Sequence, residues 1–157
     1  NTHKLYCKGW VGTNIDLNPY SIDLFNFVRK KDRNILAALA PKKYKTKVYF
    51  DSYFSTLNTI DIKHKDIHHN INKNNKNYTI TTKTFEEIIS KKFDFLNIDI
   101  EGMDFSVLKT IDLKKYSPKL ICIEILKDKD LKLIKKYFSK RNYKFVGKKQ
   151  VSYFFSN

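Results

Sequence analysis

Hydrophobic and polar positions along this chain predict strands and helices in turn. Apolar or alternating runs typical of strands cover residues 10–17, 34–40, 47–51, 78–82, 94–100, 119–125, 143–146 and 151–155. Apolar residues at helical spacing predict helices at 84–90, 103–110 and 128–140, one that follows Asn18, and the end of one over residues 1–8. This alternation favours an α/β fold, with a mostly parallel sheet that carries a C-terminal antiparallel hairpin at its edge.

Local signals sharpen several of these elements. Asn18 is a good N-cap and Pro19 a good first helical residue. The helix after them carries an apolar stripe, made of Ile22, Leu24, Phe25, Phe27 and Val28. The helix at 128–140 has an apolar side, made of Leu131, Leu133, Ile134, Tyr137 and Phe138. Thr84 and Glu87 have capping-box spacing, and the continuous apolar run at 119–125 predicts a strand buried on both faces.

The length of 157 residues predicts a single domain over 1–157, without internal repeats. Residues 52–77 lose all periodicity and become polar and rich in Asn and Lys, so we expect a flexible basic surface loop there. No run of about 18 apolar residues exists, and so we expect no transmembrane segment.

Two acids at the end of a predicted strand are the leading candidates for chemistry. Apolar residues run up to Ile98, and Asp99 and Glu101 follow two residues apart, on one side of an extended backbone. Gly102 allows a sharp turn into the next helix, whose first turn holds Asp104. Carboxylates at the carboxyl end of a strand suit a general base or a metal-ligand pair. The alternative is solvated acids that cap the helix.

Other polar residues leave two interpretations open. Asp16 ends a predicted strand, where an acid commonly accepts hydrogen bonds from a ribose, although simple solvation also explains it. Glu124, near the end of the strand at 119–125, is either a satisfied core acid or a site residue. His64, His68 and His69 have metal-like spacing but lie in the aperiodic segment, which favours a surface role.

The formal net charge of +15 raises the possibility of nucleic-acid binding. Only three basic residues are Arg, however, and Lys, Asn, Ile, Phe and Tyr are abundant together, which AT-rich coding also produces. A basic nucleic-acid-binding α/β module therefore stays the second hypothesis. Cys7 and Cys122 form no CxxC pair, and Cys122 is expected to be a buried, reduced thiol of a cytoplasmic protein.

The sequence has no glycine-rich phosphate loop, no GxSxG and no HExxH pattern, which disfavours nucleotide hydrolases, serine hydrolases and zinc proteases. Several pieces in order instead resemble the FkbM-type S-adenosylmethionine-dependent methyltransferases. They lie at 9–19, 57–59, 82–89, 94–102 and 116–124. The most specific are Asp99-Ile100-Glu101-Gly102 and the later Pro118-Lys119-Leu120-Ile121-Cys122-Ile123-Glu124 strand.

The resemblance implies a class I methyltransferase fold, a Rossmann-like three-layer sandwich, with S-adenosylmethionine as methyl donor. It implies an acceptor hydroxyl on a sugar, glycan or natural product. Asp16 and Asn18 would contact the cofactor, and Asp99, Glu101 and Asp104 would be catalytic, with a divalent metal possible at Asp99 and Glu101. The family's first strand and cofactor loop would precede residue 1, so we expect a fragment, with a non-catalytic relic of the fold as a third hypothesis.

Overall fold

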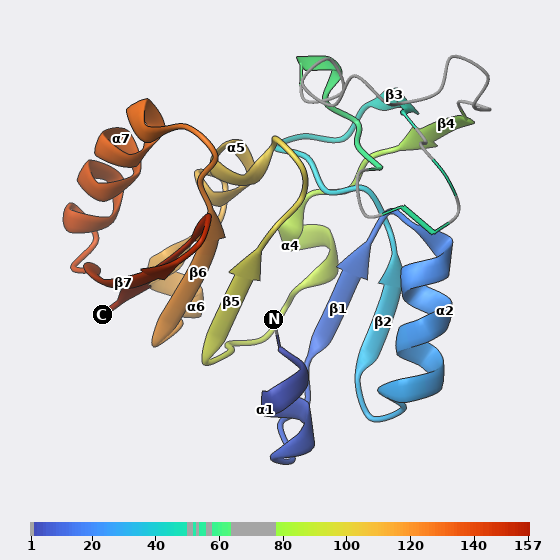
Figure 1. Ribbon diagram of the computed structural model, residues 1–157, viewed down its shortest axis with the longest axis horizontal. Helices are drawn as coiled ribbons and strands as arrows, with labels where there is room; N and C mark the ends of the chain where they lie inside the picture. Colours follow the sequence, from blue (N-terminus) through green and yellow to red (C-terminus); the bar gives the residue numbers. More distant parts are fainter. Residues whose placement is uncertain (1, 50–51, 53, 56–57, 64–77) are drawn as a thin grey trace. The chain divides into compact units, whose positions relative to one another are not determined.

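The computed structural model describes residues 2–49, 52, 54–55, 58–63 and 78–157. It divides into two compact units, shown in Figure 1. The first unit comprises Asn1–Phe85 and Ile100–Met103, and the second comprises Glu86–Asp99 and Asp104–Asn157. Each unit contains its own sheet structure and is described by itself below.

A parallel strand pair with one crossover helix begins the first unit. After the short helix α1 (His3–Cys7), β1 (Thr13–Asp16) runs parallel to β2 (Arg33–Leu36), and α2 (Pro19–Val28) connects them. The helix begins as its sequence predicts, because the Asn18 side chain accepts a hydrogen bond from the Tyr20 N–H and proline occupies the first turn.

The first unit also contains a small antiparallel sheet of β3 (Lys45–Val48) and β4 (Tyr78–Thr81). A compact apolar core forms beside it from Ala38, Ala40, Val48 and Ile60, against which Leu17, Tyr44, Ile80 and Met103 pack. This core brings the segment after β2 and the 100–103 segment into contact with β3 and β4. Parts of the sequence that are far apart are thereby held together by apolar burial.

A buried ionic network stabilises the β1–β2 pair at the end where both strands begin. The side chains of Arg29 and Asp32 are only 7% and 4% exposed, with 3.8 Å between the guanidinium and the carboxylate. Asp32 also accepts hydrogen bonds from the Gly12 N–H at 2.8 Å and the Asn14 side chain at 3.0 Å. Arg29 donates to the Thr2 hydroxyl at 2.6 Å. These bonds tie the end of α2 to the start of β1 and compensate for the burial of two charges.

The second unit is built on a four-stranded sheet. Its strand order is β5 (Phe95–Ile98), β6 (Leu120–Glu124), β8 (Ser152–Ser156) and β7 (Lys144–Lys149), with only the β5–β6 pair parallel. Four helices accompany these strands: α4 (Phe85–Ile88), α5 (Asp104–Leu108), α6 (Leu113–Tyr116) and α7 (Asp128–Ser139). The core is formed where Phe138 of α7 stacks on Phe155 of β8, with 4.1 Å between ring centroids.

The structure confirms part of the predicted fold and corrects the rest. Residues 121–123 are at most 2% exposed, as a strand buried on both faces requires. The described residues form three small sheets, however, rather than one mostly parallel sheet. The predicted C-terminal antiparallel hairpin is confirmed at the edge of its sheet, where β7 is the outermost strand and β8 pairs with β6. The helix α6 was not predicted, because four residues give too short a pattern.

Two predicted apolar helix faces are only partly buried. On α2, Ile22 is buried, whereas Leu24, Phe27 and Val28 are 44%, 75% and 44% exposed. On α7, Ile134 and Phe138 are buried and Leu133 is exposed. The flexible loop predicted at 52–77 falls largely on residues 64–77, which lie outside the described residues. Asn58, Thr59 and Ile60, from its first part, are buried.

Removing the cation of the buried network should destabilise the fold. We expect Arg29→Ala to lower the free energy of unfolding by about 3–5 kcal/mol, because it leaves the buried Asp32 carboxylate without its cation. Urea unfolding followed by circular dichroism measures this change. The exposed neighbour gives the control: Lys30→Ala should stay within about 0.5 kcal/mol of the unsubstituted protein. Equal midpoints for the two variants would contradict a stabilising role for the network.

Candidate functional site

An acid lies at the carboxyl end of β1. Asp16 is half-buried, and its Oδ1 accepts a hydrogen bond from the Asn18 N–H at 2.8 Å, which fixes the orientation of the carboxylate. The Tyr78 hydroxyl donates to the Leu17 carbonyl at 3.2 Å. Burial raises the pKa of the Tyr78 phenol, and the negative charge of Asp16 raises that pKa further. The carboxyl end of β1 therefore presents an oriented negative charge beside a phenol that stays protonated.

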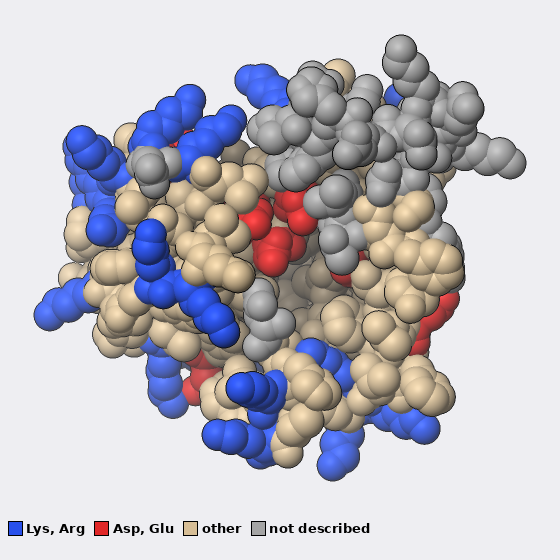
Figure 2. Space-filling view, in the orientation of Figure 1, with Lys and Arg blue, Asp and Glu red and all other residues tan. Residues whose placement is uncertain are grey.

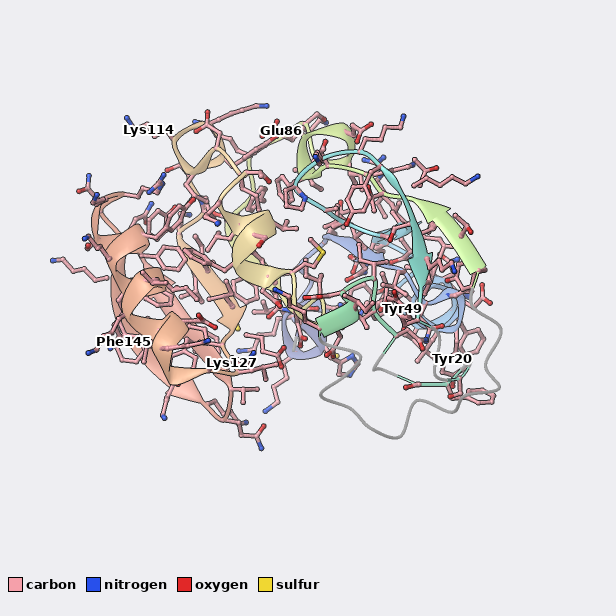
Figure 3. All side chains as sticks on the ribbon, turned by 90° about the horizontal axis from the view of Figure 1, so that it is seen from above. Tyr20, Tyr49, Glu86, Lys114, Lys127 and Phe145 are labelled. Atoms are coloured by element: carbon pink, nitrogen blue, oxygen red, sulfur yellow. The ribbon has the colours of Figure 1, made fainter. Side chains whose placement is uncertain are left out.

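Asn18 forms structural hydrogen bonds with both the oxygen and the nitrogen of its side-chain amide. It is 3% exposed; its Oδ1 accepts from the Tyr20 N–H at 3.0 Å, and its Nδ2 donates to the Ser55 carbonyl at 2.9 Å. The predicted helix cap is confirmed, and the predicted contact with a cofactor stays a prediction. Tyr20, labelled in Figure 3, packs edge to face against the exposed Phe54 ring, with 4.8 Å between centroids.

A single backbone carbonyl organises the short segment beside this strand end. Besides Asn18, the Asn58 side chain donates to the Ser55 carbonyl at 3.2 Å and to the Ser52 carbonyl at 3.1 Å. Asn58 is 5% exposed, so these bonds are shielded from water. Sequence reasoning missed this arrangement, although the piece at 57–59 had been noticed without a role.

The second candidate region follows β5, and it differs from the sequence expectation in geometry. The strand ends at Ile98, Asp99 is exposed, and Glu101 has a φ of 54°, in the left-handed region. The expectation that Asp99 and Glu101 alternate along one extended strand was therefore wrong, because the backbone is no longer extended at Glu101. Gly102, with a φ of 103°, makes the turn that its lack of a Cβ permits.

The Glu101 backbone is held from within the first unit. The Thr59 hydroxyl donates to the Glu101 carbonyl at 2.8 Å, and the Thr59 hydroxyl oxygen accepts from the Asp61 N–H at 3.0 Å. Thr59 is fully buried. Asp99, in contrast, belongs to the second unit, so the chain passes from one unit to the other between Asp99 and Glu101.

Asp104 is the first residue of α5 and is 7% exposed. A negative charge in the first turn of a helix is stabilised by the unpaired N–H groups there. This position agrees with the alternative of an acid that stabilises the start of the helix, and the predicted catalytic role of Asp104 stays a prediction.

The β6 strand carries the remaining candidates of the second unit. Burial raises the pKa of the Cys122 thiol to about 11, an effect that a hydrogen bond from Ser152 reduces and the charge of Asp99 strengthens. Glu124 ends the strand, half-buried and in register with Ser152 of β8. Cys122 is thus the buried thiol that its apolar neighbours predict, while the role of Glu124 stays open.

Metal ligands do not gather in the part of the chain that the structure describes. No group of three or more His, Cys, Asp or Glu side chains there has the geometry to hold a metal ion. The three histidines with metal-like spacing, His64, His68 and His69, lie outside the described residues. A divalent metal at Asp99 and Glu101 stays a prediction.

Basic side chains of the described residues lie at several places on the face that Figure 2 shows. In Figure 2 the Lys and Arg side chains spread over the visible face and its rim and do not form one continuous basic patch. Nucleic-acid sites concentrate such charge on one face or along one helix, so this view gives no support to a nucleic-acid interface. None of the described helices is long and apolar enough to cross a membrane.

Comparison with known proteins gives one family. The family model described as the methyltransferase FkbM domain matches residues 1–145. No match was found among curated proteins, and none among solved structures. The matched range contains β1 with Asp16, β5 with Asp99, and the Glu101–Gly102 turn.

The two thiols should differ sharply in reactivity. Cys7 is exposed, whereas Cys122 is buried with a pKa of about 11 and stays protonated at pH 8. We expect one rapidly reacting thiol per folded molecule with a disulfide reagent such as Ellman's reagent, and two after unfolding in guanidinium. Cys7→Ser should abolish the rapid phase. A rapid phase that survives this substitution would show that Cys122 is accessible.

Proposed function

We propose, from the premise that this chain belongs to the FkbM methyltransferase domain family, that it methylates a hydroxyl oxygen of a sugar, glycan or natural product. Membership of the family makes the chain an S-adenosylmethionine-dependent methyltransferase and implies a small-molecule acceptor. The match over residues 1–145 is the observation that carries the proposal. The Rossmann-like fold that the family implies agrees with the parallel β1–β2 and β5–β6 pairs.

Asp16 has the chemistry to hold the cofactor's ribose. It is an oriented carboxylate at the carboxyl end of a parallel strand, where ligands bind in open α/β sheets. An ionised carboxylate only accepts hydrogen bonds, which suits the two hydroxyls of a ribose. Asn18 would act by holding the helix start and the Ser55 segment around this acid.

The acids after β5 are proposed to serve the acceptor. The cofactor supplies a methyl group on a positively charged sulfur, which leaves as a neutral thioether. The protein has to align the acceptor oxygen with that methyl group and to remove the hydroxyl proton as the new oxygen–carbon bond forms. Asp99 or Glu101 would accept the proton, and Asp104 would support the start of α5. The same two acids would hold a divalent cation if the reaction requires one.

Loss of the Asp16 charge should weaken cofactor binding. Asp16→Asn keeps an oxygen that can accept from the Asn18 N–H, so the turn survives while the charge is lost. We expect the affinity for S-adenosylmethionine, measured by titration calorimetry on the purified protein, to fall about 10- to 100-fold. The control is Asp94→Asn, because Asp94 forms an exposed ion pair with Lys119 and should leave the affinity unchanged. Equal affinities for both variants would contradict the ribose assignment.

Loss of the acceptor-side acids should lower turnover far more than cofactor affinity. We expect Asp99→Asn or Glu101→Gln to lower kcat about 100-fold or more, as general-base removal does, with the dissociation constant for S-adenosylmethionine within about 3-fold. Transfer of labelled methyl groups to a panel of monosaccharides, glycans and hydroxylated natural products measures this. Asp94→Asn is again the control, since Asp94 precedes the same strand at its opposite end. A dependence on added Mg²⁺ that either substitution abolishes would assign the metal role instead.

Two outcomes would contradict the proposal as a whole. Salt-sensitive binding of DNA or RNA, without saturable binding of S-adenosylmethionine, would indicate the nucleic-acid module. A folded protein that neither binds the cofactor nor transfers a methyl group would indicate a relic of the fold.

A further inference from the structure

The left-handed backbone at Glu101 is costly and needs a physical cause. A residue with a Cβ loses about 1–2 kcal/mol in this region relative to its ordinary conformations. Such conformers persist only where the surrounding structure enforces them, and they cluster at functional sites. Glu101 is also an acid that the family resemblance places at the acceptor side. The question is what holds its backbone there.

Thr59 supplies the enforcing contact. Its hydroxyl has a single proton, and the Asp61 N–H at 3.0 Å can only donate to the hydroxyl oxygen. The proton must therefore go to the Glu101 carbonyl, 2.8 Å away. This assignment follows from the partners alone. Because Thr59 is fully buried, water does not compete for either bond.

Thr59 is itself rigidly placed. Its backbone N–H and C=O pair with Tyr49, at 3.2 Å and 2.8 Å, directly beyond β3. The next residue, Ile60, belongs to the apolar core of the first unit, and Met103, two residues after Glu101, packs against the same core. The turn is thus fixed by a hydrogen bond at Glu101 and by apolar contacts on both sides of that bond.

We propose that Thr59 is a positioning residue, which holds Glu101 in its left-handed conformation and so aims the Glu101 carboxylate at the acceptor. This inference rests on the proposed function of Glu101 as a base. If the Glu101 carbonyl lost its hydrogen bond from Thr59, the Glu101 backbone would return toward negative φ. The Glu101 side chain would then extend from the backbone in a different direction. An error of about 1 Å at a catalytic group can lower turnover about 100-fold.

The chain offers a closely matched control for the test. Thr82 is also fully buried in the first unit, and its hydroxyl also bonds to backbone groups: it accepts from the Tyr44 N–H and lies within 3.1 Å of the Lys42 and Tyr44 carbonyls. Thr59→Val and Thr82→Val therefore remove the same group from equally dry surroundings. A purely structural effect would be similar for both.

We expect Thr59→Val to lower kcat about 10- to 100-fold with the KM for S-adenosylmethionine within about 3-fold. Thr59→Ser, which keeps the hydroxyl, should stay within about 3-fold of the unsubstituted enzyme, as should Thr82→Val at a temperature where circular dichroism shows all variants folded. In the Glu101→Gln background, Thr59→Val should lower kcat by less than a further factor of about 2, because Thr59 acts through a carboxylate that this background lacks. Multiplying losses in the double variant, or equal losses in Thr59→Val and Thr82→Val, would overturn the proposal.

A crystal structure of Thr59→Val gives a readout that does not depend on activity. The φ of Glu101 should leave the left-handed region, and a φ that stays near its present value would overturn the proposal. This measurement also separates the two levels of inference. If Glu101→Gln alone leaves kcat unchanged, the base assignment fails, whereas the φ of Glu101 still decides whether Thr59 holds the turn. If the valine variant does not fold, Thr59→Ala takes its place in both measurements.

Discussion

The 2.8 Å hydrogen bond from Thr59 to the Glu101 carbonyl is the contact on which the candidate site depends most directly. It joins residues 42 positions apart and secures the turn after β5 to the first unit. This bond offsets part of the cost of a left-handed backbone at a residue with a Cβ. The apolar core that contains Ile60 and contacts Met103 also holds this turn, through burial of apolar side chains. The hydrogen bond sets the direction of the Glu101 backbone, and apolar packing stabilises the position of the turn.

How far the sequence predicts this structure depends on the range of the forces involved. Asn18 and Pro19 predicted a helix start, because a cap involves neighbouring residues only. The run at 119–125 predicted a buried strand, because continuous apolar residues have few other stable arrangements. Arg29 is buried against Asp32 and Asn14, and the Asn14 contact comes from the preceding strand. Such a tertiary partner leaves no periodic signal.

The residues of the candidate site also divide into those that a local sequence pattern reveals and those that depend on a contact distant in sequence. The sequence singled out Asp16 and Asp99 because acids at strand ends are visible in the pattern. It misjudged the geometry of Glu101, because the alternation rule was carried three residues beyond the end of β5. It noticed the piece at 57–59 without a role, since the value of Thr59 lies in a carbonyl that is distant in sequence. The acids and the neighbouring Asn18 could be found from the sequence, but the distant Thr59 that holds the Glu101 backbone could not.

The strand order of the second unit has a consequence for how the chain acquires its fold during synthesis. β8 lies between β6 and β7, although it is the last of the three to leave the ribosome. Until residues 152–156 emerge, β6 has no neighbour on that edge and β7 has no strand to join, so Phe138 also lacks its stacking partner Phe155. The pair β5–β6 therefore has an unpaired edge of backbone N–H and C=O groups until β8 is made, and such an edge can pair with other chains. The last strand of this unit is thus the one that completes its sheet.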